Sequence, residues 1–429
     1  MTESTASSRS VREKVRARQG KRYSAERRFR LLGVTSIVIA VSALLLLLGS
    51  MIVKGSSAFV QTHLLLEITL SAEELAPNGK PDAKAMADAN YTAFIRRALA
   101  KKFSDVRSRR DKRSLYKLIS EGASIRLQKL VAASPDMIGT TVPFAAKASD
   151  DVDQYFKGKL PKGQTGRLSA KQTKWVETLR EAGEIETRFN TAFFTNGDSR
   201  EPELAGIWGA MMGSLLAMAV TLVLSFPLGV AAAIYLEEFA PRNRWTDLIE
   251  VNINNLAAVP SIVFGLLGLA VFLNFFGMPR SAPLVGGMVL ALMTLPTVII
   301  AGRAALGAVP PSIREAALGV GASPMQVVLH HVLPLAMPGI LTGTIIGAAR
   351  ALGETAPLLM IGMVAFIVDI PGSITDPATA LPVQIFLWAD SPERAFVERT
   401  AAATLVLLAF LIVMNLLAVI LRKRFERRW

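Results

Sequence analysis

Long apolar stretches alternate with polar segments along the 429-residue chain. A helix crosses the hydrocarbon core of a bilayer with about 20 apolar residues, and six stretches reach that length. They lie at residues 31–53, 207–235, 248–276, 283–308, 338–368 and 400–421. The first exceeds the apolar core of a secretory signal, which has about 7–15 residues, so we interpret it as an uncleaved anchor. The pattern predicts an all-α integral membrane protein with six transmembrane helices.

The polar segments define the domains between and beside these helices. Residues 1–30 form a Ser/Arg-rich basic tail that we expect to be mobile. The anchor 31–53 is followed by a long insertion, 54–206, between the first and second helices. Residues 207–421 then form a five-helix core, and residues 422–429 form a second basic tail.

The insertion shows helical spacing of apolar residues and only a weak strand signal. Helices are predicted at 82–103, 112–133 and 168–190, and in the last of these Trp175 and Ile185 lie near one stripe. We therefore expect a small, mainly helical domain. Its sequence offers no motif that assigns it a chemistry.

Lysine and arginine are distributed unequally between the two sets of loops, which predicts the orientation of the chain. The tail 1–30 carries ten of them and 422–429 carries five. Both termini and the segment 302–335 are therefore predicted to be cytoplasmic, and the insertion 54–206 to be extracytoplasmic. The insertion is itself basic, but long domains cross the membrane largely regardless of charge.

Composition narrows the function classes. Hydrophobic residues make up 51% of the chain and the mean hydropathy is +0.39, which is typical of a membrane protein with a sizeable polar part. The net charge of +14 raises the possibility of nucleic-acid binding, but the basic tails flank apolar spans, so anionic lipid is the simpler partner. The chain has no cysteine, and His63, His330 and His331 form no metal-ligand pattern, so we expect no metal site.

Residues 312–334 form a polar break with strong helix signals. Ser312 and Glu315 have the spacing of a capping box, and Gly321 is suited to end that helix in the left-handed conformation. Ser323 and Gln326 repeat the box for a second helix. Two short capped helices closed by Pro334 would form a rigid knob for docking to a partner.

The spacing within this knob resembles the EAA loop of ABC importer permeases. In that family the loop is the cytoplasmic coupling helix that fits a groove on the ATPase. The residues that match are Glu315, Ala316, Ala317, Gly321, Leu333 and Pro334. One position departs from the family, because His331 stands where isoleucine is usual. The alternative is an ordinary connector between two helices.

Two charges lie within the fifth apolar stretch. An arginine or an acid at the centre of a membrane helix costs about 2.5–3.5 kcal/mol, so such residues usually face a polar path or a partner. Arg350 and Glu354 are four residues apart and share a helix face. They are either a structural clamp between helices or a path-lining pair in which the guanidinium of Arg350 meets an anion.

The segment from Arg350 through Gly353-Glu354-Thr355-Ala356-Pro357 is similar to the signature of PstA-type permeases of phosphate importers. The likeness covers about half of the chain. It implies that Arg350 and Glu354 take part in phosphate passage. Arg303, in a stretch where many members carry more charges, either adds to the pathway or extends to lipid headgroups.

The chain lacks the phosphate-binding loop G-x-x-x-x-G-K-[ST], a catalytic triad and a dinucleotide motif, so we expect a transporter subunit without its own ATPase site. The resemblance implies the partners: an ATP-binding cassette ATPase dimer, a second homologous permease, a periplasmic phosphate-binding protein, phosphate and the lipid bilayer. It also implies a multi-pass protein of the bacterial inner membrane that needs no cofactor.

Three other functions stay open at this point. In the first, the chain belongs to an importer of molybdate, tungstate or sulfate, because these tetrahedral oxyanions share the geometry of phosphate. In the second, the chain is a membrane scaffold in phosphate signalling. In the third, it is a secondary transporter that works without an ATPase.

Overall fold

A computed structural model describes residues 3–76, 83–158 and 167–425. The chain divides into two units, residues 1–54 and 55–429, which are described separately. The first unit is built by α1 (Glu3–Gly55), and large apolar side chains along it, such as Leu46 at 75%, are exposed. The basic tail is helical from Glu3 onward, because arginine, lysine, glutamate and alanine favour helix and no proline interrupts them, and its mobility stays a prediction.

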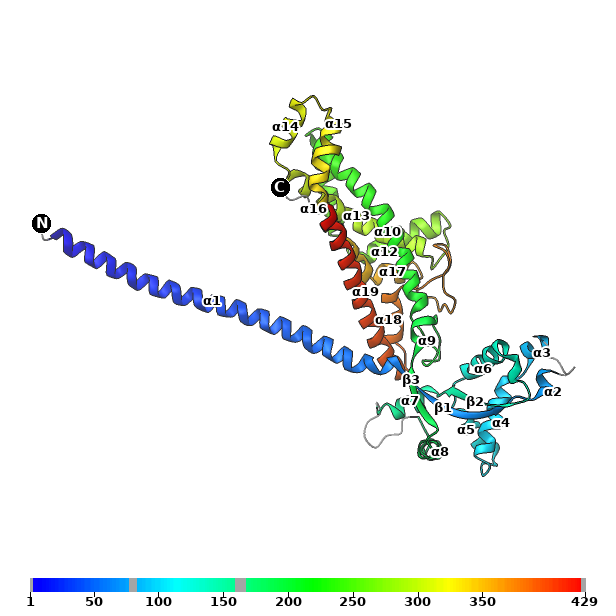
Figure 1. Cartoon of the computed structure of the whole chain (residues 1–429). Coiled ribbons are helices and arrows are strands. Elements are labelled where there is room, and N and C mark those ends of the chain that lie inside the picture. The colour runs from blue at the N-terminus through cyan, green and yellow to red at the C-terminus, as the bar shows by residue number, and fades with distance from the viewer. Residues whose placement is uncertain (1–2, 77–82, 159–166, 426–429) are drawn as a thin grey trace. The chain divides into compact units, whose positions relative to one another are not determined.

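The insertion domain, residues 56–206, wraps helices around a three-stranded sheet (Figure 1). The strands are β1 (Val60–Thr69), β2 (Thr141–Lys147) and β3 (Ile185–Phe189), and β1 pairs antiparallel with both neighbours in the order β2-β1-β3. The other elements are η1 (Ser56–Phe59), α2 (Ala72–Leu75), α3 (Ala83–Asp88), α4 (Tyr91–Lys102), α5 (Arg109–Tyr116), α6 (Gly122–Ala133), η2 (Pro135–Met137), α7 (Asp150–Phe156), α8 (Ala170–Glu181) and α9 (Thr191–Thr195).

This sheet corrects the expectation of an all-α chain, although the protein as a whole is mainly helical, as predicted. The predicted helix 168–190 ends at Glu181, and Ile185 lies on β3 instead of on a helical stripe. Successive side chains of β1 point to opposite faces of the sheet. Leu64, Leu66 and Ile68 lie on the same face and are all buried in one apolar cluster. The other predicted helices are present as α3 with α4 and as α5 with α6.

The core, residues 207–425, is helical throughout its regular elements. They are α10 (Trp208–Ile234), η3 (Tyr235–Phe239), α11 (Arg244–Ala257), α12 (Ser261–Gly268), η4 (Leu269–Phe275), α13 (Pro283–Gly307), α14 (Pro311–Gly319), α15 (Pro324–Gln326), η5 (Val327–Val332), α16 (Leu333–Gly353), α17 (Ala356–Met360), α18 (Leu381–Ala389) and α19 (Ala395–Phe425). The segments η3, η4 and η5 are π-helical and continue the helices before them.

Five helices in the described residues are long and apolar enough to cross a membrane, and a bent pair makes a sixth crossing if it counts as one span. The bent pair is the predicted span 248–276, in which α11 and α12 meet at 100°. Pro260 lies at the bend and cannot donate the backbone bond that would continue α11. The predicted span 338–368 is shifted, because the helix runs from Pro324 to Gly353 and ends where Glu354 becomes extended.

Helices α10, α13 and α16 form the centre of the core, with α13 packed against both others. Small residues allow the close approach. A side chain at Gly287 of α13 would place its Cβ 2.5 Å from the Cβ of Val220 on α10. A Cβ at Gly343 of α16 would overlap the Cβ of Ala301 on α13. Small residues at helix contacts are what packing in a membrane requires.

We predict that Gly343→Val destabilises the protein, because the added side chain forces α16 away from Ala301. Overpacking of this kind costs about 1–3 kcal/mol. The thermal unfolding midpoint in detergent measures the effect. Gly319→Ala is the matched control, since a Cβ there would meet nothing within 4 Å and should leave the midpoint unchanged or slightly raised. Equal midpoints for Gly343→Val and the unaltered protein would contradict the packing argument.

Candidate functional site

The predicted coupling loop, residues 311–334, lies at one end of the core, where Figure 1 places α14 and α15. Helix α14 begins at Pro311, with Pro310 as its N-cap and no side-chain cap. The predicted capping box of Ser312 and Glu315 is therefore wrong. Proline is favoured at the first helical position, so Pro311 starts the helix two residues earlier than a cap at Ser312 would, and Ser312 falls inside it.

The end of α14 follows the prediction. Gly321 is left-handed, with φ of +88°, and its N–H donates to the carbonyl of Leu318 at 2.9 Å. The N–H of Ala322 donates to the carbonyl of Ala317 at 3.1 Å, which completes a Schellman motif. Since a residue with a side chain is strained at this φ, glycine fixes the turn that separates the two helices of the loop.

The second capping box is confirmed, but the helix that it starts is longer than expected. The Ser323 N–H donates to Gln326 Oε1 at 2.9 Å, and the Gln326 N–H donates to Ser323 Oγ at 3.4 Å. The helix then continues to Gly353 instead of closing at Pro334. The π-helical η5 precedes Pro334, so the wider turn carries the chain past a residue with no N–H to donate.

The loop presents both polar and apolar groups on its surface. Glu315, Ala316 and Gly321 are exposed, whereas Ala317 is 5% exposed and belongs to an apolar cluster with Val327. Leu333 and Pro334 are half-buried at the base of the loop. Exposed apolar side chains on the loop are Leu318, Val320, Met325 and Leu329. A surface of this composition is suited to docking against another protein.

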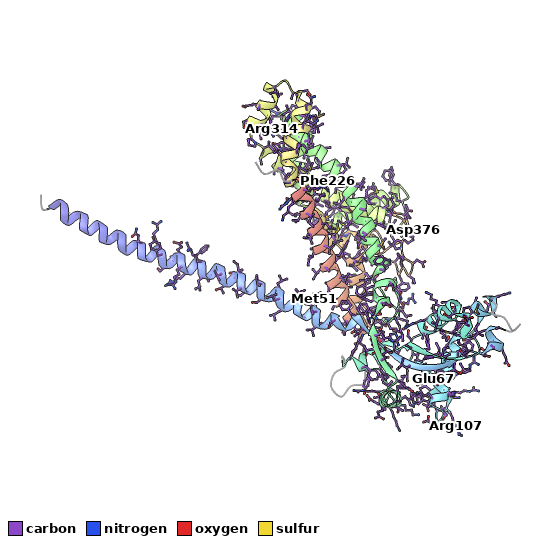
Figure 2. The ribbon with its side chains drawn as sticks, in the orientation of Figure 1. Met51, Glu67, Arg107, Phe226, Arg314 and Asp376 are labelled. Atoms are coloured by element: carbon purple, nitrogen blue, oxygen red, sulfur yellow. The ribbon has the colours of Figure 1, made fainter. Side chains whose placement is uncertain are left out.

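Arg314 joins this loop to the first helix of the core (Figure 2). Its guanidinium donates to both carboxylate oxygens of Glu238 on η3, at 2.6 and 3.2 Å. It also donates to the carbonyls of Leu306, at 2.9 Å, and Val309, at 2.7 Å. The bond to Glu238 raises the pKa of Arg314 above its usual value. A bidentate ion pair with two further acceptors holds α14 in a defined position against α13 and η3.

Arg303 makes a second ion pair with the same helix end. Its Nε lies 3.3 Å from Glu237 Oε2, and another guanidinium nitrogen lies 2.7 Å from Glu250 Oε1 on α11. The Arg303 side chain is 27% exposed. The two adjacent acids of η3 therefore bind different arginines. Glu237 binds Arg303 of α13, and Glu238 binds Arg314 of α14. The structure pairs Arg303 with protein carboxylates, and its role in the pathway or at lipid headgroups stays a prediction.

Arg350 and Glu354 lie at the far end of α16 from the coupling loop. Arg350 Nε is 3.5 Å from Glu354 Oε1, so the two charges meet as the spacing predicts. They do not share a continuous helix, because α16 ends at Gly353 and Glu354 is extended. The Arg350 side chain is 53% exposed and that of Glu354 is 20% exposed. The guanidinium is thus open on one side in this chain.

The structure does not bring Arg303 and Arg350 together. Ala305 of α13 lies opposite Gly339 and Ala301 lies opposite Gly343, so Arg303 is level with about residue 341 of α16. Nine residues of helix separate that level from Arg350, which is roughly 14 Å at 1.5 Å per residue.

Sequence reasoning missed the residues that brace the loop, namely Arg314, Glu238 and Glu250. The available signal was the acidic pair Glu237-Glu238 at the end of an apolar stretch, where two adjacent charges need partners. The partners are 66 and 76 residues away, however, and no spacing rule identifies them.

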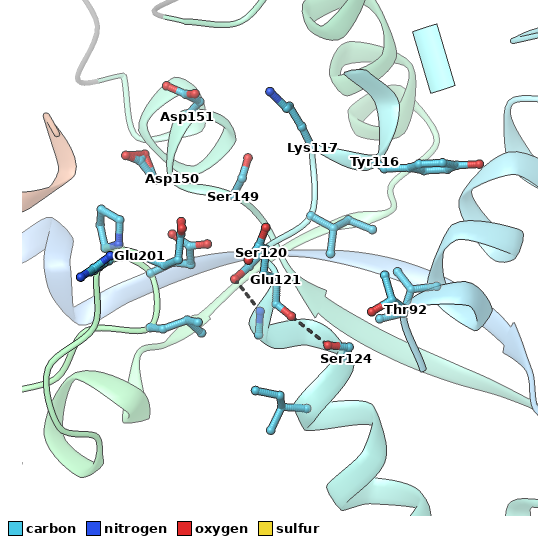
Figure 3. A pocket seen from close by; sticks show the side chains of 18 of the residues that line it. Thr92, Tyr116, Lys117, Ser120, Glu121, Ser124, Ser149, Asp150, Asp151 and Glu201 are labelled. Carbon is cyan, nitrogen blue, oxygen red and sulfur yellow. Dashed lines mark hydrogen bonds between the residues drawn. The ribbon is translucent and has the colours of Figure 1, made fainter. Parts of the chain in front are cut away.

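The insertion domain contains a pocket of about 1000 Å³ (Figure 3). Its walls include Thr92 of α4, Tyr116 of α5, Ser124 of α6 and Glu201 from the segment that leads into α10. Acidic and basic side chains both line it. No group of three or more potential metal ligands was found in the part of the chain that the structure describes.

Several acids of this pocket are harder to ionise than usual. Burial, with the neighbouring Asp151 and Glu203 charges, raises the pKa of Asp150 to about 7. Burial also raises the pKa of Asp151 and Glu203. One carboxylate oxygen of Asp150 has no hydrogen-bond partner among the described residues. Ionisation of these acids therefore lowers the stability of the folded protein relative to the unfolded chain.

We predict that Asp150→Asn stabilises the protein at pH 8 but not at pH 3. An unfolded aspartate has a pKa of about 3.9, so below that value both states are protonated and nothing is gained. Between about 4 and 7 the unfolded chain releases a proton that folded Asp150 retains, and stability falls as pH rises. Asparagine removes this loss. Thermal unfolding midpoints across pH measure it; a difference between variant and parent that did not grow from pH 4 to 7 would contradict the assignment.

Comparison with known proteins identifies two parts of the chain. Residues 225–429 match the family described as the binding-protein-dependent transport system inner membrane component. Residues 16–164 match a domain of unknown function, DUF3333. The insertion domain in the structure extends beyond that match, because β3 and α9 follow residue 164.

Three relatives illustrate the similarity. The phosphate transport system permease protein PstA 1 of Mycobacterium tuberculosis is 33% identical over 223 residues, which cover 52% of this chain and 72% of the relative. PstA of Mycobacterium leprae is 33% identical over 226 residues, covering 52% and 72%. PstA of Haemophilus influenzae is 29% identical over 223 residues, covering 52% and 78%. The chain therefore belongs to the PstA-type permeases of binding-protein-dependent ABC importers, a family of the inner membrane.

Proposed function

We propose that this chain is a transmembrane subunit of an ATP-driven importer that moves inorganic phosphate into the cell. The observation that carries the cargo is the similarity to relatives named as phosphate transport permeases, over the whole core. Membership of the family implies an ATPase and a substrate-binding protein as partners. We further propose that these are an ATPase dimer below, a second homologous permease beside this chain, and a periplasmic phosphate-binding protein.

The coupling role is assigned to the loop that carries Glu315, Ala316, Ala317 and Gly321. Glu315, Ala316 and Gly321 are exposed, a turn fixed by Gly321 separates the two helices of the loop, and the Arg314–Glu238 ion pair holds the loop against the core. A loop held this firmly transmits a push from the ATPase to α10 through Glu238, and to α16 through Leu333 and Pro334. We propose that the loop and both termini face the cytoplasm. Residues 1–2 and 426–429 lie outside the described residues.

The pathway role is assigned to Arg350, with Glu354 as its positioning partner. A half-exposed guanidinium in a membrane-spanning helix is a poor group to leave facing lipid, so a polar surface is its natural environment. Paired donors match the oxygens of a phosphate anion. Glu354 moderates this attraction, which allows the anion to leave. Arg303, held by Glu237 and Glu250, is assigned to the structure of the cytoplasmic mouth.

Labelled phosphate uptake at low external concentration tests the cargo and the site. The host lacks its own copy of this subunit and keeps the other components. We expect the chain to restore uptake and Arg350→Gln to lower it about ten- to hundredfold, the effect of losing a charge-assisted contact. Arg280→Gln, a change at an exposed arginine of a loop, should leave uptake intact.

Each outcome of the uptake measurement supports a different function. Equal uptake by the parent and Arg350→Gln keeps phosphate as the cargo and makes Arg350 a structural clamp. No phosphate uptake by either, with the complex assembled, overturns the cargo, and uptake of molybdate, tungstate or sulfate would then identify it. Uptake that persists after ATP depletion, with the ion gradient preserved, would indicate a secondary transporter. Phosphate-responsive gene expression without uptake would indicate a signalling scaffold.

We predict that Arg314→Gln uncouples the loop, because Glu238 is 10% exposed and would lose the cation that pairs with it. Uptake should fall at least fivefold. The exchange Arg314→Glu with Glu238→Arg should recover part of the loss by restoring the pair in reverse. Arg242→Gln, at an exposed arginine near Glu238 in the chain, is the control and should transport normally. A double exchange no better than the single variants would argue against the ion pair as the brace.

A further inference from the structure

The insertion domain and the permease core share an apolar cluster. Ala58, Phe193 and Ala205 from the insertion domain pack in it with Leu381, Trp388, Phe396 and Ala402 from α18 and α19. Aromatic rings connect the two sides, with Phe193 6.4 Å from Trp388 and Trp388 5.6 Å from Phe396 between centroids. The indole N–H of Trp388 donates to Asp198 at 2.9 Å. This is the anatomy of a domain core, not of a contact between independently moving parts.

A fully buried arginine lies beside this cluster. Arg399, in the first turns of α19, is 1% exposed. Its guanidinium donates to the carbonyl of Ala205 at 2.8 Å and to Gln61 Oε1 on β1 at 3.3 Å. Gln61 is itself fully buried. Both acceptors come from the insertion domain, so this arginine of a membrane-spanning helix depends on that domain for its hydrogen bonds.

A second set of charges crosses the same boundary. Lys157, which follows α7, lies 2.5 Å from Asp153 Oδ2 and 2.8 Å from Glu398 Oε1 of α19. The exposed fractions of these three side chains are 7% or less. Asp153 also accepts the backbone N–H of Thr62 on β1 at 2.8 Å. The chain Thr62–Asp153–Lys157–Glu398 therefore links the sheet to α19 by buried charge-assisted bonds.

Separating the insertion domain from α19 would break both sets at once. Removing one partner of a buried pair leaves a charge without compensation, which is strongly unfavourable. Arg399 Nε and Glu398 Oε2 already lack a hydrogen-bond partner among the described residues, so each of these two side chains depends on the few bonds that it makes across the junction. The junction therefore resists sliding as well as separation.

Helix α19 carries this restraint into the core. It packs along α16, and Arg422 near its other end donates to Thr342 Oγ1 of α16 at 3.2 Å. Helix α16 carries Arg350 at one end and continues from the coupling loop at the other. The position of α19 thus bears directly on the helix with the proposed site.

We propose that the insertion domain serves as a buttress that holds the N-terminal end of α19, so that the two move as one body during transport, with Arg399 as the positioning residue. This goes beyond the proposed function, which assigns no role to residues 56–206. The domain is then part of the moving machinery, and not a separate receptor on a flexible joint.

The test uses the absence of cysteine from the chain. Ala58→Cys places one thiol at a fully buried position of the junction, and Ser104→Cys places one at an exposed position of the same domain. The assembled complex is treated with a water-soluble maleimide, once without nucleotide and once trapped with ATP and vanadate. We expect Ala58→Cys to react at least tenfold more slowly than Ser104→Cys in both states. Equal rates in either state would overturn the buttress, because the junction would then open during the cycle.

A second experiment tests the role of Arg399. In the Ala58→Cys background, Arg399→Gln should raise the labelling rate at least tenfold and lower uptake, whereas Arg394→Gln, at an exposed arginine of the same segment, should change neither. Unchanged labelling with Arg399→Gln would overturn the positioning role. If that variant does not assemble, the comparison of the two nucleotide states still decides the buttress. Labelling requires no phosphate, so a wrong cargo would leave this result intact.

Discussion

The arrangement of this protein depends on the pairing of buried and partly buried arginines with acceptors from other elements. Arg303, Arg314 and Arg399 each bind acceptors that are distant in the sequence, the farthest being 338 residues away. A guanidinium in a region of low dielectric is stable only where those acceptors are in place. Each pair therefore fixes the position of one element against another: α13 against η3 and α11, α14 against η3, and α19 against the insertion domain.

Helix geometry determines which charges can meet. The small residues of α13 and α16 let α10, α13 and α16 approach closely, so the ends of these helices lie together at the coupling loop. The π-helical turn η3 then presents two consecutive acids, and since neighbouring residues of a helix point in different directions, Glu237 and Glu238 reach different partners. Glu237 pairs with Arg303 of the core, and Glu238 pairs with Arg314 of the loop. The same short segment thus links the packing of the membrane helices to the position of the surface that we assign to the ATPase.

Local signals in the sequence predicted local structure well. The box at Ser323 and the turn at Gly321 depend on residues within five positions of each other, and both are present. Features that depend on distant partners were missed. Strand β1 pairs with residues 72 and more positions away, as at Thr69 and Thr141, so its apolar run gave no clear strand signal. The partners of Arg314 and Arg399 likewise depend on the tertiary fold, and neither residue stood out in the sequence.

The two arginines Arg399 and Arg350 illustrate how burial separates a structural charge from a charge that is available to a ligand. Both occur in membrane-spanning helices. Arg399 is closed off by a domain that supplies its acceptors, and little of its surface is left to meet anything else. Arg350 has an acid one turn away and is 53% exposed, so it keeps donors for a further partner. A fixed arginine stabilises the frame, whereas an open one can exchange partners. A transporter needs both, because an anion can pass from site to site only through a frame that keeps its own arrangement.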